Sequence, residues 1–302
     1  MVAKKSLYPH PKNPVILASG IMGTTGASLT RMAYNGAGAV VTKSIGPVPK
    51  KGHSNPTMIE LENGFLNAMG LPNPSYTEFV QEIKNAKNNT STPIIASIFA
   101  GDTEGFVKVA EELSSANPDG FELNVSCPHA EGYGATIGCD SCLVEEITAS
   151  VCDVIDVPVW VKLTPNVTNI VDIGKAAERG GADAVVAINT VRGMSIDINT
   201  GYPILGNRYG GLSGRAIRPI AVKCVYDLYA SLDIPVVGVG GVSCWQDAVE
   251  MIMAGASAVQ VGSAVSQSMD VFKSISSGIE DYLSANEYST IDEIIGFSHK
   301  MG

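Results

Sequence analysis

Eight short runs of mostly apolar residues follow one another along the chain, separated by stretches of helical character or by longer loops. Most of the runs are continuously apolar, which is typical of parallel strands that are covered on both faces. They span residues 15–19, 37–43, 93–99, 120–126, 157–163, 182–189, 234–240 and 256–262. This α/β alternation predicts a closed (β/α)8 TIM barrel, because an open doubly wound sheet usually has fewer strands.

Helical segments are predicted between these runs from the pattern of their apolar residues. They include residues 77–88, 102–116, 169–181, 216–230 and 245–256. Several end in Gly-Ala or Gly-Gly just before the next strand, which is a usual signal for the end of a helix. With 302 residues, of which 45% are apolar, the chain is long enough for one barrel with a large core. No linker-like segment interrupts it, so we expect a single domain over residues 1–302.

Charge and cysteine content exclude several classes of function. The chain has 20 basic and 30 acidic residues, and a net charge of −10 argues against nucleic-acid binding, which needs clustered Lys and Arg. No apolar run approaches the roughly 20 residues of a membrane-spanning helix, and the polar N-terminal segment is unlike a signal peptide. The 6 cysteines are scattered, which favours reduced thiols. We therefore expect a cytoplasmic protein with no nucleic-acid or membrane partner.

Two connections between predicted strands are too long for simple turns. They span residues 44–76 and 189–214. Long connections of this kind in a compact barrel usually cover an active site at the carboxyl ends of the strands. We expect long inserted βα loops over that face of the barrel.

Polar residues stand where several predicted strands end. Lys43 and Lys162 end the second and fifth strands, and Asn124 and Asn189 lie near the ends of the fourth and sixth. A lysine inside an apolar run is costly unless it has a polar or anionic partner. Each lysine taken alone is also explained by an ion pair within the protein. Two lysines and two asparagines at equivalent strand ends favour a small anionic ligand.

Glycine-rich turns follow the last two predicted strands, in "GVGG" (238–241) and "VGSA" (261–264). Backbone N–H groups of adjacent turns can converge on a phosphate group, and barrels often bind phosphate at this place. The segment "GGLSG" (210–214) would supply a third contact. Such turns also serve as plain connections, but the pair on neighbouring strands favours a phosphate site.

Cys127 lies in "ELNVSCPHAEGYG" (122–134), at the point where an apolar run stops. A passive cysteine usually lies inside an apolar pattern, so this position favours a reactive group, either a nucleophile or a proton-abstracting base. No Ser-His-Asp logic supports acyl transfer. Cys139 and Cys142 form a single CxxC without a second pair, and we interpret it as structural or incidental and predict no metal site.

Taken together, these motifs resemble the dihydroorotate dehydrogenase family from about residue 13 to residue 285. The resemblance is carried by "NPVILASG", "VVTKS", "GFLNAMGLPNP", "ELNVSCP", "VKLTPNV", "INTVRGM", "PILGNRYGGLSGRAIRP", "GVGGV" and "AVQVGSA". The cysteine in "NVSCP" is similar to that of the cytosolic, cysteine-using enzymes. The segment that begins "INTVRGMSIDINTG" is similar to the NAD-linked heteromeric subgroup, in its catalytic subunit.

This resemblance implies an FMN-dependent oxidation of (S)-dihydroorotate to orotate in pyrimidine (UMP) biosynthesis. Cys127 would take the proton from ring carbon 5, and the hydride from carbon 6 would pass to flavin N5. Implied substrate contacts are Lys43, Asn67, Met69, Gly70, Leu71, Asn124, Asn189 and Thr190. Implied FMN contacts are Ala18, Ser19, Gly20, Lys43, Ser44, Asn124, Lys162, Ile188, Gly214, Gly240, Gly241, Gly262 and Ser263.

The resemblance also implies a homodimer and an electron acceptor reached through another protein. The sequence contains neither a dinucleotide fingerprint nor an iron–sulfur cysteine cluster. If NAD is the acceptor, a second subunit with FAD and an iron–sulfur cluster would relay the electrons.

Two alternatives stay open at this point. His129 stands where the family's cysteine motif has Asn, and "SCPH" is also similar to the pyrimidine-reducing domain of dihydropyrimidine dehydrogenase. An FMN-dependent reductase of uracil or thymine is therefore the first alternative, which Lys43 and "LNAMGLPN" disfavour. The second is a barrel that only binds a phosphorylated ligand, which Cys127 and the two lysines disfavour.

Overall fold

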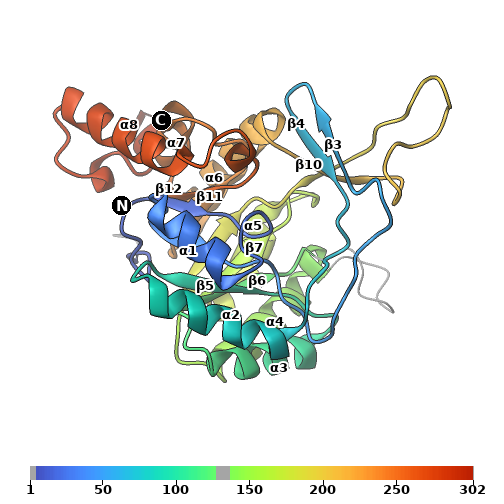
Figure 1. Ribbon diagram of the computed structural model, residues 1–302. Coiled ribbons are helices and arrows are strands. Elements are labelled where there is room, and N and C mark those ends of the chain that lie inside the picture. Colours follow the sequence, from blue (N-terminus) through green and yellow to red (C-terminus); the bar gives the residue numbers. More distant parts are fainter. Residues whose placement is uncertain (1–4, 127–136, 302) are drawn as a thin grey trace.

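Eight parallel strands close into a barrel in the computed structural model, which describes residues 5–126 and 137–301 (Figure 1). Strand β1 closes the ring by pairing with both β2 and β12. The predicted barrel is confirmed, and each of the eight predicted runs contains one of its strands. The barrel strands are β1 (Val15–Leu17), β2 (Ala39–Val41), β5 (Ile94–Ile98), β6 (Gly120–Asn124), β7 (Val159–Leu163), β8 (Ala184–Ala187), β11 (Val236–Val239) and β12 (Ala256–Val261).

Helices pack around the outside of the barrel (Figure 1). They are α1 (Gly26–Tyr34), α2 (Tyr76–Asn89), α3 (Thr103–Ser114), α4 (Ser141–Cys152), α5 (Ile170–Arg179), α6 (Arg218–Ser231), α7 (Trp245–Met253) and α8 (Val271–Ala285). Short 3-10 helices span Ile137–Cys139, Arg215–Ile217, Ser263–Ser266, Ile291–Glu293 and Phe297–Met301. The five predicted helical segments correspond to α2, α3, α5, α6 and α7. Among the helices of the described ranges, none is long and apolar enough to cross a membrane.

Local sequence signals explain where the helices begin. The Asp102 carboxylate accepts a hydrogen bond from the Gly105 N–H and caps α3, and the Asn169 side chain caps α5 through the Val171 N–H. Each side chain binds an N–H group that has no partner within its helix. These caps fix where each helix starts and so limit the length of the loop between strand and helix.

The interior of the barrel is apolar at one level and polar at the next. Trp160 is buried in the inner apolar cluster, and its Nε1–H donates to the Tyr8 carbonyl at 2.8 Å. Because side chains alternate along a strand, Lys162 faces the same side of β7 as Trp160. Ala258 and Gln260 have the same relationship on β12. The fold thus places a layer of polar side chains nearer the carboxyl ends of the strands than the apolar layer.

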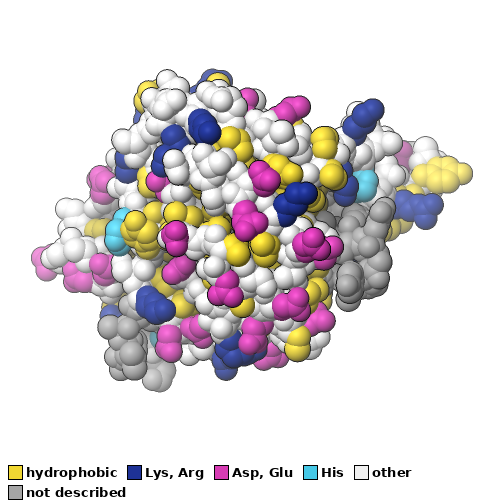
Figure 2. All heavy atoms as spheres, turned by 90° about the horizontal axis from the view of Figure 1, so that it is seen from below, with side chains coloured by type: hydrophobic (Ala, Val, Ile, Leu, Met, Phe, Trp, Pro, Cys, Tyr) yellow, Lys and Arg dark blue, Asp and Glu magenta, His cyan; other side chains and the backbone are white. Residues whose placement is uncertain are grey.

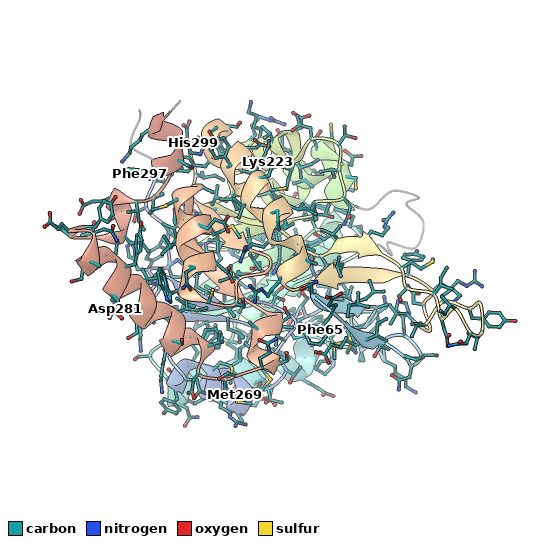
Figure 3. The ribbon with its side chains drawn as sticks, turned by 90° about the horizontal axis from the view of Figure 1, so that it is seen from above. Phe65, Lys223, Met269, Asp281, Phe297 and His299 are labelled. Carbon is teal, nitrogen blue, oxygen red and sulfur yellow. The ribbon has the colours of Figure 1, made fainter. Side chains whose placement is uncertain are left out.

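The two long connections form a second sheet beside the barrel, at the upper right of Figure 1. Its strands are β3 (Met58–Leu61), β4 (Gly64–Asn67), β10 (Gly210–Ser213) and β9 (Val191–Gly193), in that order. Strand β10 pairs antiparallel with both β4 and β9, so residues 44–76 and 189–214 are joined. Figure 3 shows this sheet from above, with Phe65 of β4 labelled. The sequence predicted long loops here, and their pairing into a sheet was not predicted.

Candidate active site

One cavity with a volume of about 560 Å³ lies between the carboxyl ends of the barrel strands and the small sheet. Its wall includes Asn124 and Asn189 from the barrel, and Gly210 and Gly211 from β10. Of the predicted substrate residues, those that line this cavity are Asn67, Met69, Gly70, Leu71, Asn124, Asn189 and Thr190. The structure therefore brings together predicted substrate residues from three separate parts of the chain, and their contact with a substrate stays a prediction.

A chain of hydrogen bonds crosses the strand ends beneath this cavity. The Asn124 Nδ2 donates to Ser44 Oγ at 3.0 Å, and Ser44 Oγ lies 3.3 Å from Ser19 Oγ. The Asn189 Nδ2 donates to Asn124 Oδ1 at 3.2 Å, and Asn189 Oδ1 accepts from the Thr190 N–H at 2.8 Å. These contacts orient both amide groups. They also connect predicted substrate residues with predicted cofactor residues.

The loop at Met69–Leu71 has a tightly held backbone. Gly70 has φ of +74° and Leu71 has φ of +54°, and the latter conformation is uncommon for a leucine. A Cβ on Gly70 would lie 2.6 Å from the backbone nitrogen of His53, so only glycine fits there. The Asn73 Nδ2 donates to the Leu71 carbonyl at 3.0 Å. The loop is therefore preshaped, and Met69, Gly70 and Leu71 all line the cavity.

Lys43 follows β2 and is half-buried. Burial lowers the pKa of its ammonium group below the ordinary value of 10.5, because leaving water disfavours the charged form. Lys43 makes no ion pair with another described residue. It is not among the residues that line the large cavity. Its contact with a substrate stays a prediction.

Lys162 has partners that the sequence did not identify. Its Nζ lies 3.5 Å from Oε1 of Glu122 and donates to Oε1 of Gln260 at 3.2 Å. The Gln260 Nε2 in turn donates to Oε2 of Glu122 at 2.7 Å. All three side chains are buried. For Lys162, the ion pair considered as the alternative explanation is therefore present. The signal in the sequence was a charged residue inside the apolar run "GFELNVS", two residues before Asn124 and so on the same face of the strand.

A smaller cavity of about 80 Å³ lies where the glycine-rich turns meet. Of the predicted phosphate residues, Gly214, Gly241 and Ser263 line it. Gly241 has φ of +77°, and a Cβ there would lie 2.9 Å from the Gly214 carbonyl oxygen. The close approach of these two turns therefore requires glycine at residue 241.

Other residues around this small cavity were not predicted. Arg215 and Ser243 line it and could bind an anion, and Glu60 and Glu62 also line it and would oppose one. Because the charges are mixed, backbone N–H groups and hydroxyls would have to make most contacts with a phosphate. Gly240 and Gly262, which precede Gly241 and Ser263 in the sequence, do not line the cavity.

The remaining cofactor candidates lie at adjacent strand ends. The Ala18 N–H donates to the Val261 carbonyl at 2.9 Å, which places the end of β1 beside the end of β12. A Cβ on Gly262 would lie 3.6 Å from the Ala18 Cβ, and one on Gly20 would have no neighbour within 4 Å. The Ile188 N–H donates to the Val239 carbonyl at 2.7 Å at the end of β8. Of these residues, Gly20 is the one beside which the structure shows open space.

Cys127 and His129 lie outside the described residues, so their predicted roles have no structural counterpart here. Cys139 lines the large cavity, and both it and Cys142 are free and exposed. In residues 5–126 and 137–301, no group of three or more His, Cys, Asp or Glu side chains is arranged to hold a metal ion.

The family model and the similar proteins found by comparison indicate the same family. The model of the family described as dihydroorotate dehydrogenase matches residues 1–283. A protein of Methanosarcina acetivorans named "Dihydroorotate dehydrogenase B (NAD(+)), catalytic subunit" is 68% identical over 291 residues, which cover 96% of this chain and 94% of that protein. Proteins with the same name from Pyrococcus abyssi and Methanocaldococcus jannaschii are 52% and 51% identical. These two matches each cover 96% of this chain, and 96% and 95% of the relatives.

Proposed function

Because this chain belongs to the dihydroorotate dehydrogenase family, we infer that it is an oxidoreductase that converts (S)-dihydroorotate to orotate in pyrimidine biosynthesis. The observation that carries this inference on the structural side is the large cavity. Residues from both long connections and from two strand ends converge on it, in the set that the family resemblance implies for the substrate. No observation favours the uracil or thymine reductase considered above.

We propose FMN as the cofactor, held at the strand ends. The cavity at Gly214, Gly241 and Ser263 is lined by a close pair of glycine turns, by hydroxyls and by Arg215, which fit a flavin phosphate, while Glu60 and Glu62 lie on the same wall. Lys162 supplies a buried ammonium group near the strand ends. When bound, FMN would accept a hydride at N5 and carry added negative charge on its reduced ring. The Lys162 ammonium would stabilise that charge.

The substrate would lie in the large cavity above those residues. The amides of Asn67, Asn124 and Asn189 would bind the polar edges of the ring, and their hydrogen bonds within the protein already hold them in place. The backbone at Gly70 and Leu71, together with Lys43, would bind the carboxylate. Pre-oriented groups of this kind reduce the entropy lost when the substrate binds.

The proton and hydride leave from adjacent ring carbons. The Cys127 thiolate would take the proton from carbon 5, and the electron pair left behind would form the double bond to carbon 6. The hydrogen on carbon 6 would depart as hydride to the flavin. A cysteine can act as a base when its pKa falls towards neutrality or when water is excluded from the site.

The acceptor would be reached through a partner protein. The relatives are named NAD(+)-linked catalytic subunits, which implies that those proteins act with another subunit. We propose that this chain likewise forms a homodimer of single-domain protomers, residues 1–302. Each would pass electrons to NAD through a subunit with FAD and an iron–sulfur cluster. We also propose that it acts in the cytoplasm.

A steady-state comparison of substrates tests this proposal. The purified chain, reconstituted with FMN, would be assayed with an uncharged dye as acceptor and with either dihydroorotate or dihydrouracil. We expect turnover with dihydroorotate and turnover lower by at least about a hundredfold with dihydrouracil, which lacks the carboxylate. Preference for dihydrouracil would contradict the proposal and would favour a pyrimidine reductase.

A further inference from the structure

The wall of the large cavity is basic although the whole chain is acidic. Lys50, Lys51 and Arg192 line it, together with His53. None of the described residues that line it is an aspartate or a glutamate. The chain as a whole has 30 acidic and 20 basic residues, so a wall whose described residues include Lys50, Lys51 and Arg192 but no carboxylate differs from the average composition.

Figure 2 shows how this distribution looks on one face of the molecule. Several Lys and Arg side chains lie at the right-hand end, to which the two long connections extend in Figure 1. Asp and Glu side chains are spread widely over the rest of that face. Other Lys and Arg side chains lie on the left and lower parts of the same face, so the basic character of the cavity wall is defined by the residues that line it.

The backbone holds the two lysines next to the preshaped loop. Lys50 and Asn73 exchange two backbone hydrogen bonds, of 2.8 Å and 3.0 Å. The His53 N–H donates to the Met69 carbonyl at 3.0 Å. Residues 50–53 therefore run directly beside Met69–Asn73, the loop that we expect to bind the substrate carboxylate.

Arg192 reaches the cavity from a different part of the chain. It lies in β9, and its N–H donates to Oδ1 of Asn166 at 2.9 Å. The Asn166 Nδ2 also donates to the Thr190 carbonyl at 3.0 Å, and Asn166 itself lines the cavity. The backbone of Arg192 is thus held by a contact to a residue of the cavity wall.

These three cations have no carboxylate partner among the described residues. The ion pairs of the structure involve other lysines and arginines, namely Lys87, Lys162, Arg179, Arg218 and Lys223. Lys50, Lys51 and Arg192 are all exposed. The positive potential of these side chains is not cancelled by a neighbouring carboxylate. A concave surface lined by charges of one sign concentrates the electrostatic field.

We propose that Lys50, Lys51 and Arg192 form a basic collar that draws the anionic substrate into the cavity. The collar would raise the rate at which dihydroorotate associates and would favour the carboxylated ring over a neutral one. It would leave the chemical step unchanged, because its side chains lie at the exposed rim. This proposal rests on the proposed function, since that function makes the substrate an anion.

The test is a set of charge-neutralising variants with a matched control. Lys50→Gln/Lys51→Gln and Lys50→Gln/Lys51→Gln/Arg192→Gln remove collar charges. Lys84→Gln/Lys108→Gln removes two exposed lysines, on α2 and α3, that do not line the cavity. The conservative variant Lys50→Arg/Lys51→Arg keeps the charge. Each FMN-loaded protein would be mixed anaerobically with dihydroorotate. The loss of flavin absorbance at about 450 nm would be followed at several salt concentrations.

The expected result is a change in association alone. At low salt the second-order rate of flavin reduction should fall about threefold in the double variant and about tenfold in the triple variant. The difference should shrink to less than about twofold at about 0.5 M salt, because ions screen exposed charges. The limiting rate at saturating substrate should stay unchanged. The control and the Arg variant should behave like the wild type.

Titration with orotate gives an independent readout. Calorimetry of the FMN-loaded protein should show that salt weakens orotate binding more in the wild type than in the triple variant. Collar variants that match the Lys84→Gln/Lys108→Gln control in both measurements would overturn the collar, as would a loss of rate that salt does not reduce. Failure of the proposed function would look different, because dihydroorotate would then not reduce the wild-type flavin at all.

Discussion

The Nζ of Lys162 lies 3.5 Å from Oε1 of Glu122 inside the closed barrel. That oxygen has no hydrogen-bond partner among the described residues, and the Glu122 side chain is 0% exposed. Gln260 bridges the two by donating to Glu122 and accepting from Lys162. A buried charge of either sign is costly alone, so each of these residues makes the other tolerable. The pair holds one buried positive group near the strand ends, within the polar layer of the barrel interior.

The first prediction concerns the stability of this pair. Either Glu122→Ala or Lys162→Met should lower the free energy of unfolding by about 3–5 kcal/mol, because each leaves an uncompensated buried charge. The double variant should lose clearly less than the sum of the two, since it leaves neither charge. Urea unfolding of the four proteins would measure this coupling. Strictly additive losses would contradict the ion pair.

The second prediction concerns the flavin. If Lys162 stabilises negative charge on the reduced cofactor, Lys162→Ala should lower the two-electron potential of bound FMN. A loss of about 1.4–2.8 kcal/mol corresponds to about 30–60 mV. Lys175→Ala removes an exposed lysine of α5 and serves as the control. An unchanged potential in the Lys162 variant would remove this lysine from the flavin site.

The third prediction concerns the base. Cys127→Ala should retain FMN but lose flavin reduction by dihydroorotate by about 10²–10⁴-fold, which is the usual contribution of a general base. Cys139→Ala is the matched control, because Cys139 is a free cysteine that lines the same cavity and has no proposed role. Rapid mixing without oxygen would compare the two. Wild-type rates in Cys127→Ala would assign the base to another group.

The fourth prediction is a pH dependence that arises from Lys43. Burial lowers its pKa in the free protein, so the ammonium group loses its proton at a lower pH than an ordinary lysine. A bound carboxylate favours the charged form and raises that pKa again. Orotate affinity should therefore decrease as the pH rises through the lowered pKa, with proton uptake on binding in that range.

Lys43→Met provides the control for this pH dependence. The variant should bind orotate at least about tenfold more weakly at neutral pH, because a charge-assisted contact is lost. Its affinity should no longer fall with pH in the alkaline range. Calorimetric titrations of orotate between pH 7 and pH 10, in buffers of different ionisation enthalpy, would measure both effects. The same alkaline loss of affinity in both proteins would assign the titration to another group.

The fifth prediction tests the phosphate site through its glycines. Gly241→Ala should lower FMN affinity at least about tenfold, because the new Cβ would lie 2.9 Å from the Gly214 carbonyl at a φ of +77°. Gly101→Ala is the control, since a Cβ there has no neighbour within 4 Å. Fluorescence titration of the apoproteins with FMN would compare them. Equal affinities would place the flavin phosphate elsewhere.

The barrel was predictable from the sequence because its strands are continuously apolar. Such a run can be identified without knowing which strands it pairs with. The small sheet was not predictable for the opposite reason. Strands β3, β4, β9 and β10 have only three or four residues each, and β10 pairs with a strand more than a hundred residues away. Nothing local in "GGLS" indicates that partner.

The candidate site was also predictable only in part. Asn124 and Asn189 were identified because polar residues at strand ends of a barrel converge in space, and the structure connects them directly. Glu122 was missed because the prediction considered polar residues at strand ends, whereas Glu122 lies inside its strand, two residues before the end of β6. The basic wall of the cavity was not predicted because Lys50 and Arg192 come from the two long connections, which the small sheet brings together.

A single-turnover measurement of stoichiometry tests directly whether the chain oxidises dihydroorotate with its flavin. FMN-loaded protein would be mixed without oxygen and without any acceptor with a small excess of (S)-dihydroorotate, and both flavin absorbance and orotate would be quantified. We expect complete reduction of the flavin, with one orotate formed per FMN. Flavin that stays oxidised with dihydroorotate, yet is reduced by dithionite in the same sample, would contradict it.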